Sequence, residues 1–254
     1  HIDERVVFVR FALPGERVRI LIDEPHNRKD RFWTGEVTEV ITASPDRVEP
    51  VWPLAGPLAW GGGVGGADLV HVSRQGQLAW KQAVISEQMK RLGHIDISVP
   101  VRPAPGDEEA GGLHWRTRLD LIADGNGRLS MRRRESHTRV ALDGMPLASQ
   151  QLCSIAEHHG LWFHPFDPDN HIRISAPEPR PGDPGLIESG NYAVLVNGEV
   201  LYGRRELTER VILNNRADFT YHVDAEGFWQ MHRMAPEVLA GTALEEMADA
   251  GADK

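Results

Sequence analysis

Seven arginine residues in one part of the sequence have the chemistry to bind phosphate groups. They lie on either side of an expected turn and are Arg116, Arg118, Arg128, Arg132, Arg133, Arg134 and Arg139. A guanidinium group donates paired hydrogen bonds to phosphate oxygens. Trp115 and His137 lie beside these arginines, and aromatic rings stack on unpaired bases. The stretch therefore favours RNA binding, although a solvated sheet face with ion pairs would have the same composition.

Three further groups of residues could carry chemistry, but their surroundings favour plainer explanations. Cys153 is expected on the apolar side of a helix, with no lysine or arginine close in sequence to lower its pKa, so we expect a structural thiol. Four histidines, at positions 158, 159, 164 and 171, do not match a metal-ligand spacing. The glycine run at 61–66 follows a proline-rich connector, whereas a dinucleotide site needs a strand before it and a helix directly after it.

The elements that would position these residues form a mainly β chain with some α-helix. Alternating and β-branched patterns predict strands at 5–11, 17–22, 32–41, 115–122, 129–134, 137–142, 172–174, 192–196 and 212–223. Helical periodicity predicts helices at 75–92, 149–159 and 236–248. Hairpin turns are expected at 124–127 and 197–198, and residues 45–67, 99–112 and 176–190 are expected to be irregular.

Composition excludes several classes of protein. The 254 residues carry a formal net charge of −9, which excludes a uniformly basic nucleic-acid binder but not a local basic face. No apolar run approaches the ~18 residues that a membrane span needs, and no signal-peptide pattern is visible. A single cysteine excludes an internal disulfide framework. We therefore expect a cytoplasmic protein without a membrane partner; the oligomeric state is not indicated.

The order of several short motifs resembles one family. The motifs at 7–9, 13–18 and 44–50 are similar to a TRAM domain, an OB-like RNA-binding barrel. The motifs at 65–71, 115–118, 133–137, 145–147 and 227–232 then follow in the order of the RNA (uracil-5-)-methyltransferase family. The resemblance covers nearly the whole chain, and its specificity comes from the ordered set of motifs.

The resemblance implies a reaction and a set of site residues. Family members transfer the methyl group of S-adenosylmethionine to C5 of a uridine in rRNA or tRNA, using a cysteine that adds to C6 and a base that removes the C5 proton. Gln230 and Phe228 match the pocket for the methyl donor and the target base. Arg116, Arg118, Arg132, Arg133, Arg134 and His137 match the central region that faces RNA. No catalytic residue is expected in this chain, because Cys153 is not at the position of the nucleophile.

Two departures from the family pattern lead to further expectations. Many members hold a [4Fe–4S] cluster with four cysteines, which the cluster needs as thiolate ligands. The matching positions here are Trp52, Val64, Ala67 and Met145, so we expect no iron–sulfur cluster and no other metal. The nucleophile and the donor-binding turn follow the Phe-x-Gln segment in the family. We therefore expect an incomplete chain that is inactive alone.

These features predict five segments. They are a TRAM barrel at 1–46 without its first strand, a connector at 47–74, a helix at 75–98 that packs on the methyltransferase domain, a β-rich central domain at 99–226, and the start of a Rossmann-like methyltransferase domain at 227–254. The expected function is formation of 5-methyluridine in rRNA or tRNA. The first alternative is a non-catalytic TRAM-type RNA-binding module, and the second is a β protein that binds a small molecule.

Overall fold

The chain folds into two compact units. The computed structural model describes residues 2, 4–24, 30–213 and 217–252. The first unit comprises residues 1–102 together with 132–138, and the second comprises residues 103–131 and 139–254. The sequence did not predict that the segment 132–138 joins the first unit. None of the described helices is both long and apolar enough to cross a membrane.

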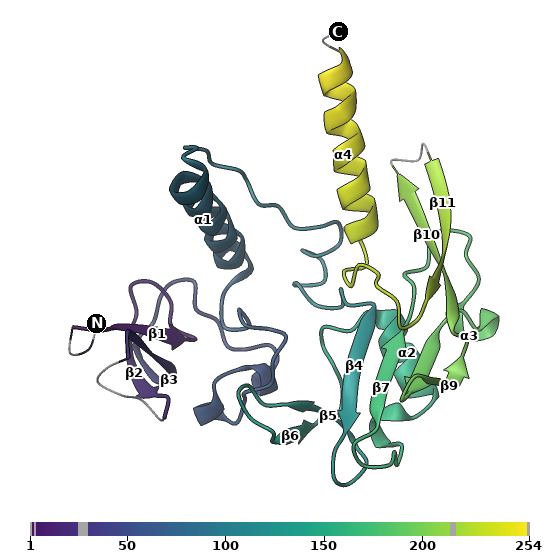
Figure 1. Ribbon diagram of the computed structural model, residues 1–254, viewed down its shortest axis with the longest axis horizontal. Helices are drawn as coiled ribbons and strands as arrows, with labels where there is room; N and C mark the ends of the chain where they lie inside the picture. The colour runs from purple at the N-terminus through teal and green to yellow at the C-terminus, as the bar shows by residue number, and fades with distance from the viewer. Residues whose placement is uncertain (1, 3, 25–29, 214–216, 253–254) are drawn as a thin grey trace. The chain divides into compact units, whose positions relative to one another are not determined.

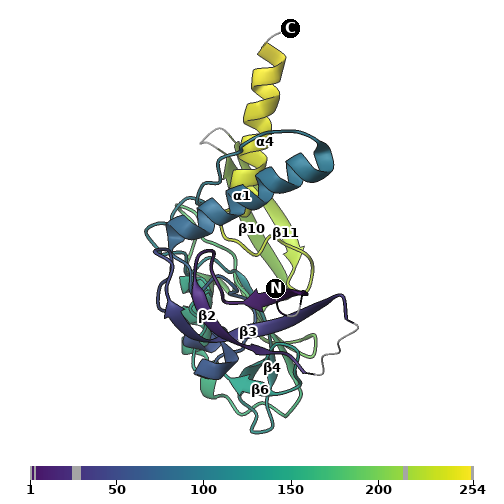
Figure 2. The same cartoon turned by 90° about the vertical axis from the view of Figure 1, so that its left-hand side faces the viewer.

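The first unit contains a small sheet and one long helix. Strands β1 (Val6–Arg10), β2 (Arg17–Ile22) and β3 (Phe32–Thr42) form a sheet in the order β1-β3-β2, as Figures 1 and 2 show. Strand β1 runs parallel to β3, and β2 runs antiparallel to it. The described strands of this unit form an open sheet, so the OB-like barrel remains a prediction.

The connector and the helix complete the first unit. The 3-10 helices η1 (Pro53–Ala55) and η2 (Leu58–Trp60) lie in the proline- and glycine-rich connector, where Ala55 and Val64 are fully buried. Helix α1 (Arg74–Gly93) begins where the Ser73 side chain accepts a hydrogen bond from the backbone N–H of Gly76. This cap satisfies one of the free N–H groups of the first turn, which explains why the helix starts there.

The second unit is built on a six-stranded sheet in the order β6-β5-β4-β7-β8-β9. Its strands are β4 (Arg118–Ala123), β5 (Leu129–Arg132), β6 (Arg139–Ala141), β7 (His171–Ser175), β8 (Ala193–Val196) and β9 (Glu199–Gly203). Helix α2 (Gln150–His158), the 3-10 helix η3 (Leu161–Phe163) and the short helix α3 (Leu186–Ser189) connect the strands. Buried aliphatic side chains from β4, α2, β7 and β8 form its core, including Leu121, Ile155, Ile174 and Leu195.

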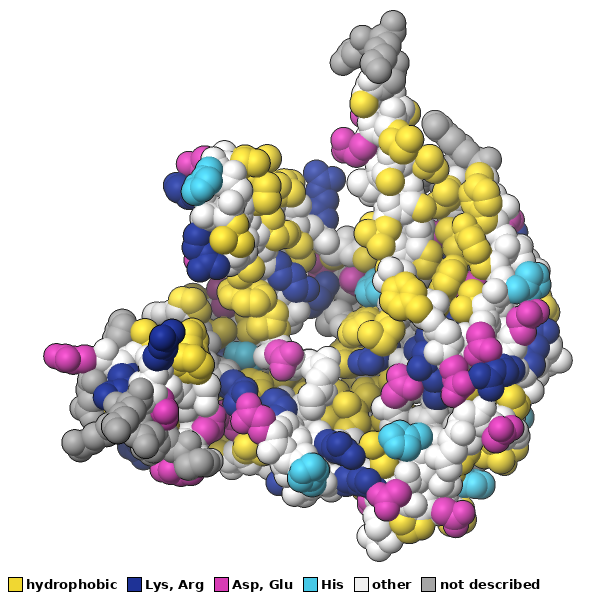
Figure 3. All heavy atoms as spheres, in the orientation of Figure 1, with side chains coloured by type: hydrophobic (Ala, Val, Ile, Leu, Met, Phe, Trp, Pro, Cys, Tyr) yellow, Lys and Arg dark blue, Asp and Glu magenta, His cyan; other side chains and the backbone are white. Residues whose placement is uncertain are grey.

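A hairpin and a terminal helix follow this sheet. Strands β10 (Glu206–Leu213) and β11 (Ala217–Asp224) pair antiparallel, and helix α4 (Ala235–Ala252) packs on β10. Exposed apolar side chains gather on β11 and α4, among them Phe219, Leu239 and Met247 (Figure 3). The single strand predicted at 212–223 was wrong, because its two ends belong to different antiparallel strands and it omits most of β10; positions 214–216 of that prediction lie outside the described residues.

Two other boundaries differ from the sequence prediction. The strand predicted at 115–122 begins at Arg118, because residues 115–117 bind the segment 231–233 instead of a neighbouring sheet strand. The strand predicted at 129–134 ends at Arg132, after which the chain turns with Glu135 in a left-handed conformation. Both hairpin turns form where they were predicted. The Asp124 side chain accepts a local hydrogen bond from the N–H of Asn126, and Asn197 and Gly198 both have the positive φ that a tight two-residue turn needs.

Candidate functional site

The segment that carries Gln230 is held against the start of β4 by backbone hydrogen bonds. The N–H of Thr117 donates to the carbonyl of Met231, and the N–H of Arg233 donates to the carbonyl of Trp115, each at 2.8 Å. The rings of Trp115 and His232 stack with centroids 5.8 Å apart. These contacts fix the backbone directly after Gln230, although the two segments are more than a hundred residues apart in sequence.

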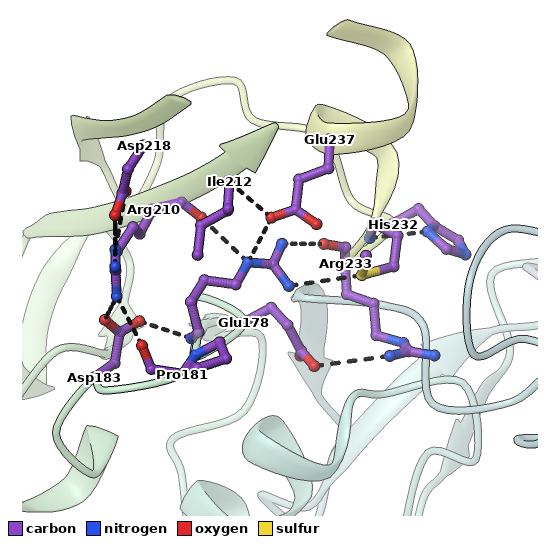
Figure 4. Close-up of polar contacts among 11 residues, drawn as sticks. Glu178, Pro181, Asp183, Arg210, Ile212, Asp218, His232, Arg233 and Glu237 are labelled. Carbon is purple, nitrogen blue, oxygen red and sulfur yellow. Dashed lines mark hydrogen bonds and ion pairs between the residues drawn. The ribbon is translucent and has the colours of Figure 1, made fainter. Parts of the chain in front are cut away.

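Arg180 ties this segment to β10 and to the start of α4. Its guanidinium group lies 2.9 Å from Oε1 of Glu237 and donates to the carbonyl oxygens of Arg233 at 3.2 Å and Arg210 at 3.3 Å. Glu237 also accepts a hydrogen bond from the N–H of Ile212 at 2.9 Å (Figure 4). Sequence reasoning missed Arg180, because nothing in its proline-rich surroundings distinguishes it from a loop arginine.

A second set of ion pairs supports the same region from the other side of β10. Arg210 lies between Asp183 and Asp218, with its Nη1 atom 2.7 Å from Oδ1 of Asp183 (Figure 4). The hydrogen bond from Arg210 lowers the pKa of the Asp218 carboxyl. Since both arginines are paired with carboxylates of this chain, they serve to position the backbone and leave little free charge for a ligand.

The resulting cleft is narrow, with a cavity volume of about 10 Å³, and is lined mainly by polar side chains. Gln230, Glu178 and Glu209 line it, together with Thr117 and Arg233. Burial raises the pKa of both the Glu178 and the Glu209 carboxyl groups. Glu209 also pairs with Arg118, whose Nη2 atom lies 2.6 Å from its Oε1 atom. The cleft therefore suits a neutral group that both donates and accepts hydrogen bonds, such as the edge of a base.

The structure places Phe228 and Gln230 differently. Gln230 is half-buried in the cleft, whereas the side chain of Phe228 is 84% exposed. The two residues therefore do not line one cavity in this structure. An exposed aromatic ring beside a polar cleft can still stack on a base that enters it.

The arginines that the sequence assigned to RNA fall into two groups. Arg118 is 1% exposed and pairs with Glu209, so its guanidinium group is not available to a phosphate. Arg134 pairs with Glu36 at 3.0 Å and donates to carbonyl oxygens of the connector, including that of Gly56 at 3.1 Å. Arg116 is half-buried and donates to the carbonyl of Arg118. These three arginines hold the fold of their own units together.

The remaining residues of that set lie in the first unit. Arg132 and His137 are exposed and Arg133 is partly exposed, and no ion pair involves any of them among the described residues. The two units also differ in charge. The first has sixteen Lys and Arg against fourteen Asp and Glu, and the second has twelve against twenty-three. Acidic and basic side chains are interspersed on the face of the second unit that Figure 3 shows. The charge distribution therefore favours the first unit for binding a polyanion.

The positions that match the cluster cysteines are occupied by packing residues. Trp52 and Val64 are buried in the first unit, Ala67 is half-buried there, and Met145 is buried in the second unit. Indole, isopropyl, methyl and thioether groups offer no thiolate. Among the described residues, no group of three or more His, Cys, Asp or Glu side chains could hold a metal ion.

Cys153 and His159 have structural surroundings. Cys153 is half-buried in α2, and burial raises the pKa of its thiol. His159 stacks on Tyr202 with ring centroids 3.9 Å apart and shares a hydrogen bond of 2.8 Å with the Tyr192 hydroxyl. A thiol with a raised pKa is mostly protonated at neutral pH and is a poor nucleophile.

Comparison with known proteins gives these features a context. No family model matches the chain. It is 60% identical over 243 residues to an uncharacterised RNA methyltransferase of Bifidobacterium longum, covering 94% of this chain and 55% of that protein. An uncharacterised RNA methyltransferase of Streptomyces avermitilis is 32% identical, covering 95% of this chain and 58% of the relative.

Two further matches concern named uracil-C5 methyltransferases. The chain is 37% identical over 156 residues to the 23S rRNA (uracil(1939)-C(5))-methyltransferase of Halomonas elongata, covering 61% of this chain and 30% of that protein. Its fold is similar to the tRNA (uracil-54, C5)-methyltransferase of Pyrococcus abyssi, whose crystal structure contains S-adenosyl-L-homocysteine. That match has a TM-score of 0.51 at 17% identity and covers 95% of this chain and 60% of the other.

These comparisons relate the chain to RNA methyltransferases. Identity of 60% across almost the whole chain makes it a relative of bacterial RNA methyltransferases. The sequence match to the 23S rRNA enzyme bears out the resemblance to the RNA (uracil-5-)-methyltransferase family, and the structural match shows a similar fold. The chain spans somewhat more than half the length of the first curated relatives that it matches.

Proposed function

We propose that this chain supplies the RNA-binding and base-positioning parts of an RNA (uracil-5-)-methyltransferase that forms 5-methyluridine in rRNA or tRNA. The observation that carries this proposal is the 60% identity over 94% of the chain to an RNA methyltransferase. The structure supports it with a rigidly held polar cleft at Gln230 and with exposed basic side chains in the first unit.

The cleft at Gln230 is the proposed place for one reacting group. Its cavity volume of about 10 Å³ holds no more than about one water molecule, so the reacting group would meet Gln230 at the mouth of the cleft. The methyl group would come from S-adenosylmethionine. The amide of Gln230 can accept from an N–H group and donate to a carbonyl, which suits the edge of uracil or the amino-acid end of the donor.

The proposed division of labour follows the two units. In the first unit, a TRAM-like segment at 1–46 and the side chains of Arg132, Arg133 and His137 would bind RNA phosphates and unpaired bases. The connector at 47–74 would support this surface, and the helix region at 75–98 would pack on the methyltransferase domain. The segment 99–226 would form the central domain, and 227–254 would lead into the methyltransferase domain.

Nucleoside mass spectrometry of cellular RNA tests the proposed reaction. We expect that cells from which the gene has been deleted lose 5-methyluridine from one position of rRNA or tRNA, and that the gene restores it. A plasmid carrying Gln230→Ala is expected to restore less. Unchanged 5-methyluridine in every rRNA and tRNA of the deletion strain would refute the reaction.

A second candidate function is a non-catalytic RNA-binding module. The exposed side chains of Arg132 and His137 in the first unit favour it, because RNA binding there needs no reacting group. RNA binding by the purified chain, measured by fluorescence anisotropy at several salt concentrations, would separate the candidates. Salt-sensitive binding together with unchanged cellular 5-methyluridine would select the module.

A further inference from the structure

A second and larger hollow lies next to the Gln230 cleft in the same unit. It has a cavity volume of about 280 Å³, close to the lower end of the range of ordinary small-ligand sites. Its principal polar side chains are Glu109, His114, Gln150, Gln151, Glu178 and Arg233. Glu178 and Arg233 line both hollows, so they form a shared wall between them.

The shared wall presents a carboxylate that lacks a close partner. Oε1 of Glu178 lies 3.8 Å from Nη1 of Arg233, which is too far for a hydrogen bond, and the two side chains point toward each other in Figure 4. No hydrogen bond to this carboxylate occurs within the described part of the chain. The side chain is only 21% exposed, and burial raises the pKa of its carboxyl. Such a group gains most from a ligand that donates hydrogen bonds to it.

The opposite side of the hollow presents groups that can donate and accept. Gln150 and Gln151 are the first two residues of α2, and the cap at Ser149 satisfies the N–H of Leu152 but not theirs. Their side-chain amides each carry a donor and an acceptor. The Nδ1 atom of His114 lies 3.0 Å from the carbonyl oxygen of Ala148 and donates to it, which fixes the orientation of the ring.

The charge around the hollow disfavours an anion. Two carboxylates, Glu109 and Glu178, line it, and Arg233 is the one arginine or lysine among the described residues of the lining; Arg233 also lies 3.9 Å from the Asp107 carboxylate. A phosphate or carboxylate ligand would meet a net negative field. The hollow instead suits a neutral, planar ligand with adjacent donors on one edge and acceptors on another.

We propose that this hollow binds an unpaired guanine base of the RNA substrate, an inference that rests on the proposed function. The N1–H and the exocyclic amino group of guanine form adjacent donors that match the two oxygens of Glu178. Its O6 and N7 acceptors match Arg233 and the amides at the start of α2. Because Glu178 and Arg233 also line the Gln230 cleft, the guanine would lie beside the target base and help to select it.

Binding of nucleosides to the purified chain tests the pocket directly. Inosine is guanosine without the amino group, so it removes one of the two donors to Glu178. We expect guanosine to bind at least tenfold more tightly than inosine, adenosine or uridine in isothermal titration calorimetry, because a site built to accept a hydrogen bond discriminates against a ligand that lacks the donor.

Matched variants assign that preference to the pocket. Glu178→Gln is expected to reduce the preference for guanosine over inosine to less than threefold, and Gln151→Ala to weaken guanosine binding without disturbing the shared wall. Glu188→Gln, which alters an exposed carboxylate of α3, serves as the control and is expected to bind as the unmodified chain does. Urea unfolding midpoints verify that each variant is folded. Equal affinity of the unmodified chain for guanosine and inosine would overturn the proposal.

The same comparison in RNA separates this inference from the proposed function. Short RNAs of substrate sequence, with each guanine in turn replaced by inosine, are titrated against the chain. Salt-sensitive RNA binding that no replacement weakens would overturn the guanine pocket and leave the proposed function standing. Guanosine binding without any RNA binding would support the pocket and count against the proposed function.

Discussion

Replacing Arg118 with methionine tests the buried ion pair that underlies the candidate site. The side chains of Arg118 and Glu209 are 1% and 7% exposed, and the pair joins β4 to β10. The variant leaves the Glu209 carboxylate buried without its partner and removes a hydrogen bond of 3.2 Å to the Thr117 hydroxyl. Removing one member of a buried pair costs about 3–5 kcal/mol of the free energy of unfolding.

A matched exposed pair provides the control. Arg173 lies 3.2 Å from Asp120 in the same sheet, but their side chains are 25% and 62% exposed. An exposed pair contributes about 0–1 kcal/mol, so Arg173→Met is expected to cost at least ~2 kcal/mol less than Arg118→Met. Both values come from urea unfolding of the full chain at pH 7, followed by circular dichroism.

The pH dependence distinguishes loss of the pair from loss of packing. Burial raises the pKa of Glu209, and Arg118 opposes this, so removal of Arg118 raises that pKa further. A carboxyl whose pKa is higher in the folded than in the unfolded state stabilises the fold at low pH, and that stability is lost as pH rises. The cost of Arg118→Met should therefore be larger at pH 8 than at pH 5, and adding Glu209→Leu should remove the difference. Equal costs for Arg118→Met and Arg173→Met, or a cost independent of pH, would refute the reasoning.

Three further predictions concern the first unit and the single cysteine. Burial, assisted by Arg47, lowers the pKa of His71 to about 4. Neutral His71 therefore contributes to the free energy of unfolding above pH ~6.5, and this contribution is lost as pH falls, up to roughly 3 kcal/mol. Unfolding curves of His71→Phe should lack this pH-dependent loss. The double variant Arg132→Glu/Arg133→Glu should weaken RNA binding. It should also reduce the slope of log affinity against log salt concentration by about 0.7 for each phosphate that is no longer neutralised. The control Arg204→Glu/Arg205→Glu in the second unit should change affinity and slope much less, and equal effects of the two variants would remove Arg132 and Arg133 from the interface. The pKa of the Cys153 thiol is raised, so an aromatic disulfide reagent at pH 8 should react with it far more slowly in the folded chain than in urea. Rapid reaction in the folded chain would contradict the assignment of Cys153 as a structural thiol.

Local sequence patterns predicted most of the regular elements. Alternation of charged and apolar residues predicted β2, and helical periodicity predicted α1 and α2 to within about two residues. Ser73 and Ser149 cap these helices through hydrogen bonds that span only three residues. Such features depend on neighbours in the chain, so they can be inferred without knowledge of the fold.

The sequence by itself also determined the family resemblance, because that rests on the order of motifs along the chain. It could not determine which arginines remain available to RNA. Arg118 and Glu209 are 91 residues apart, and Arg134 and Glu36 are 98 apart, yet each pair is joined in the folded chain. The same guanidinium group can bind a phosphate or a carboxylate with similar geometry. Tertiary structure alone brings each distant carboxylate to its arginine and buries the pair away from water, and so decides between the two.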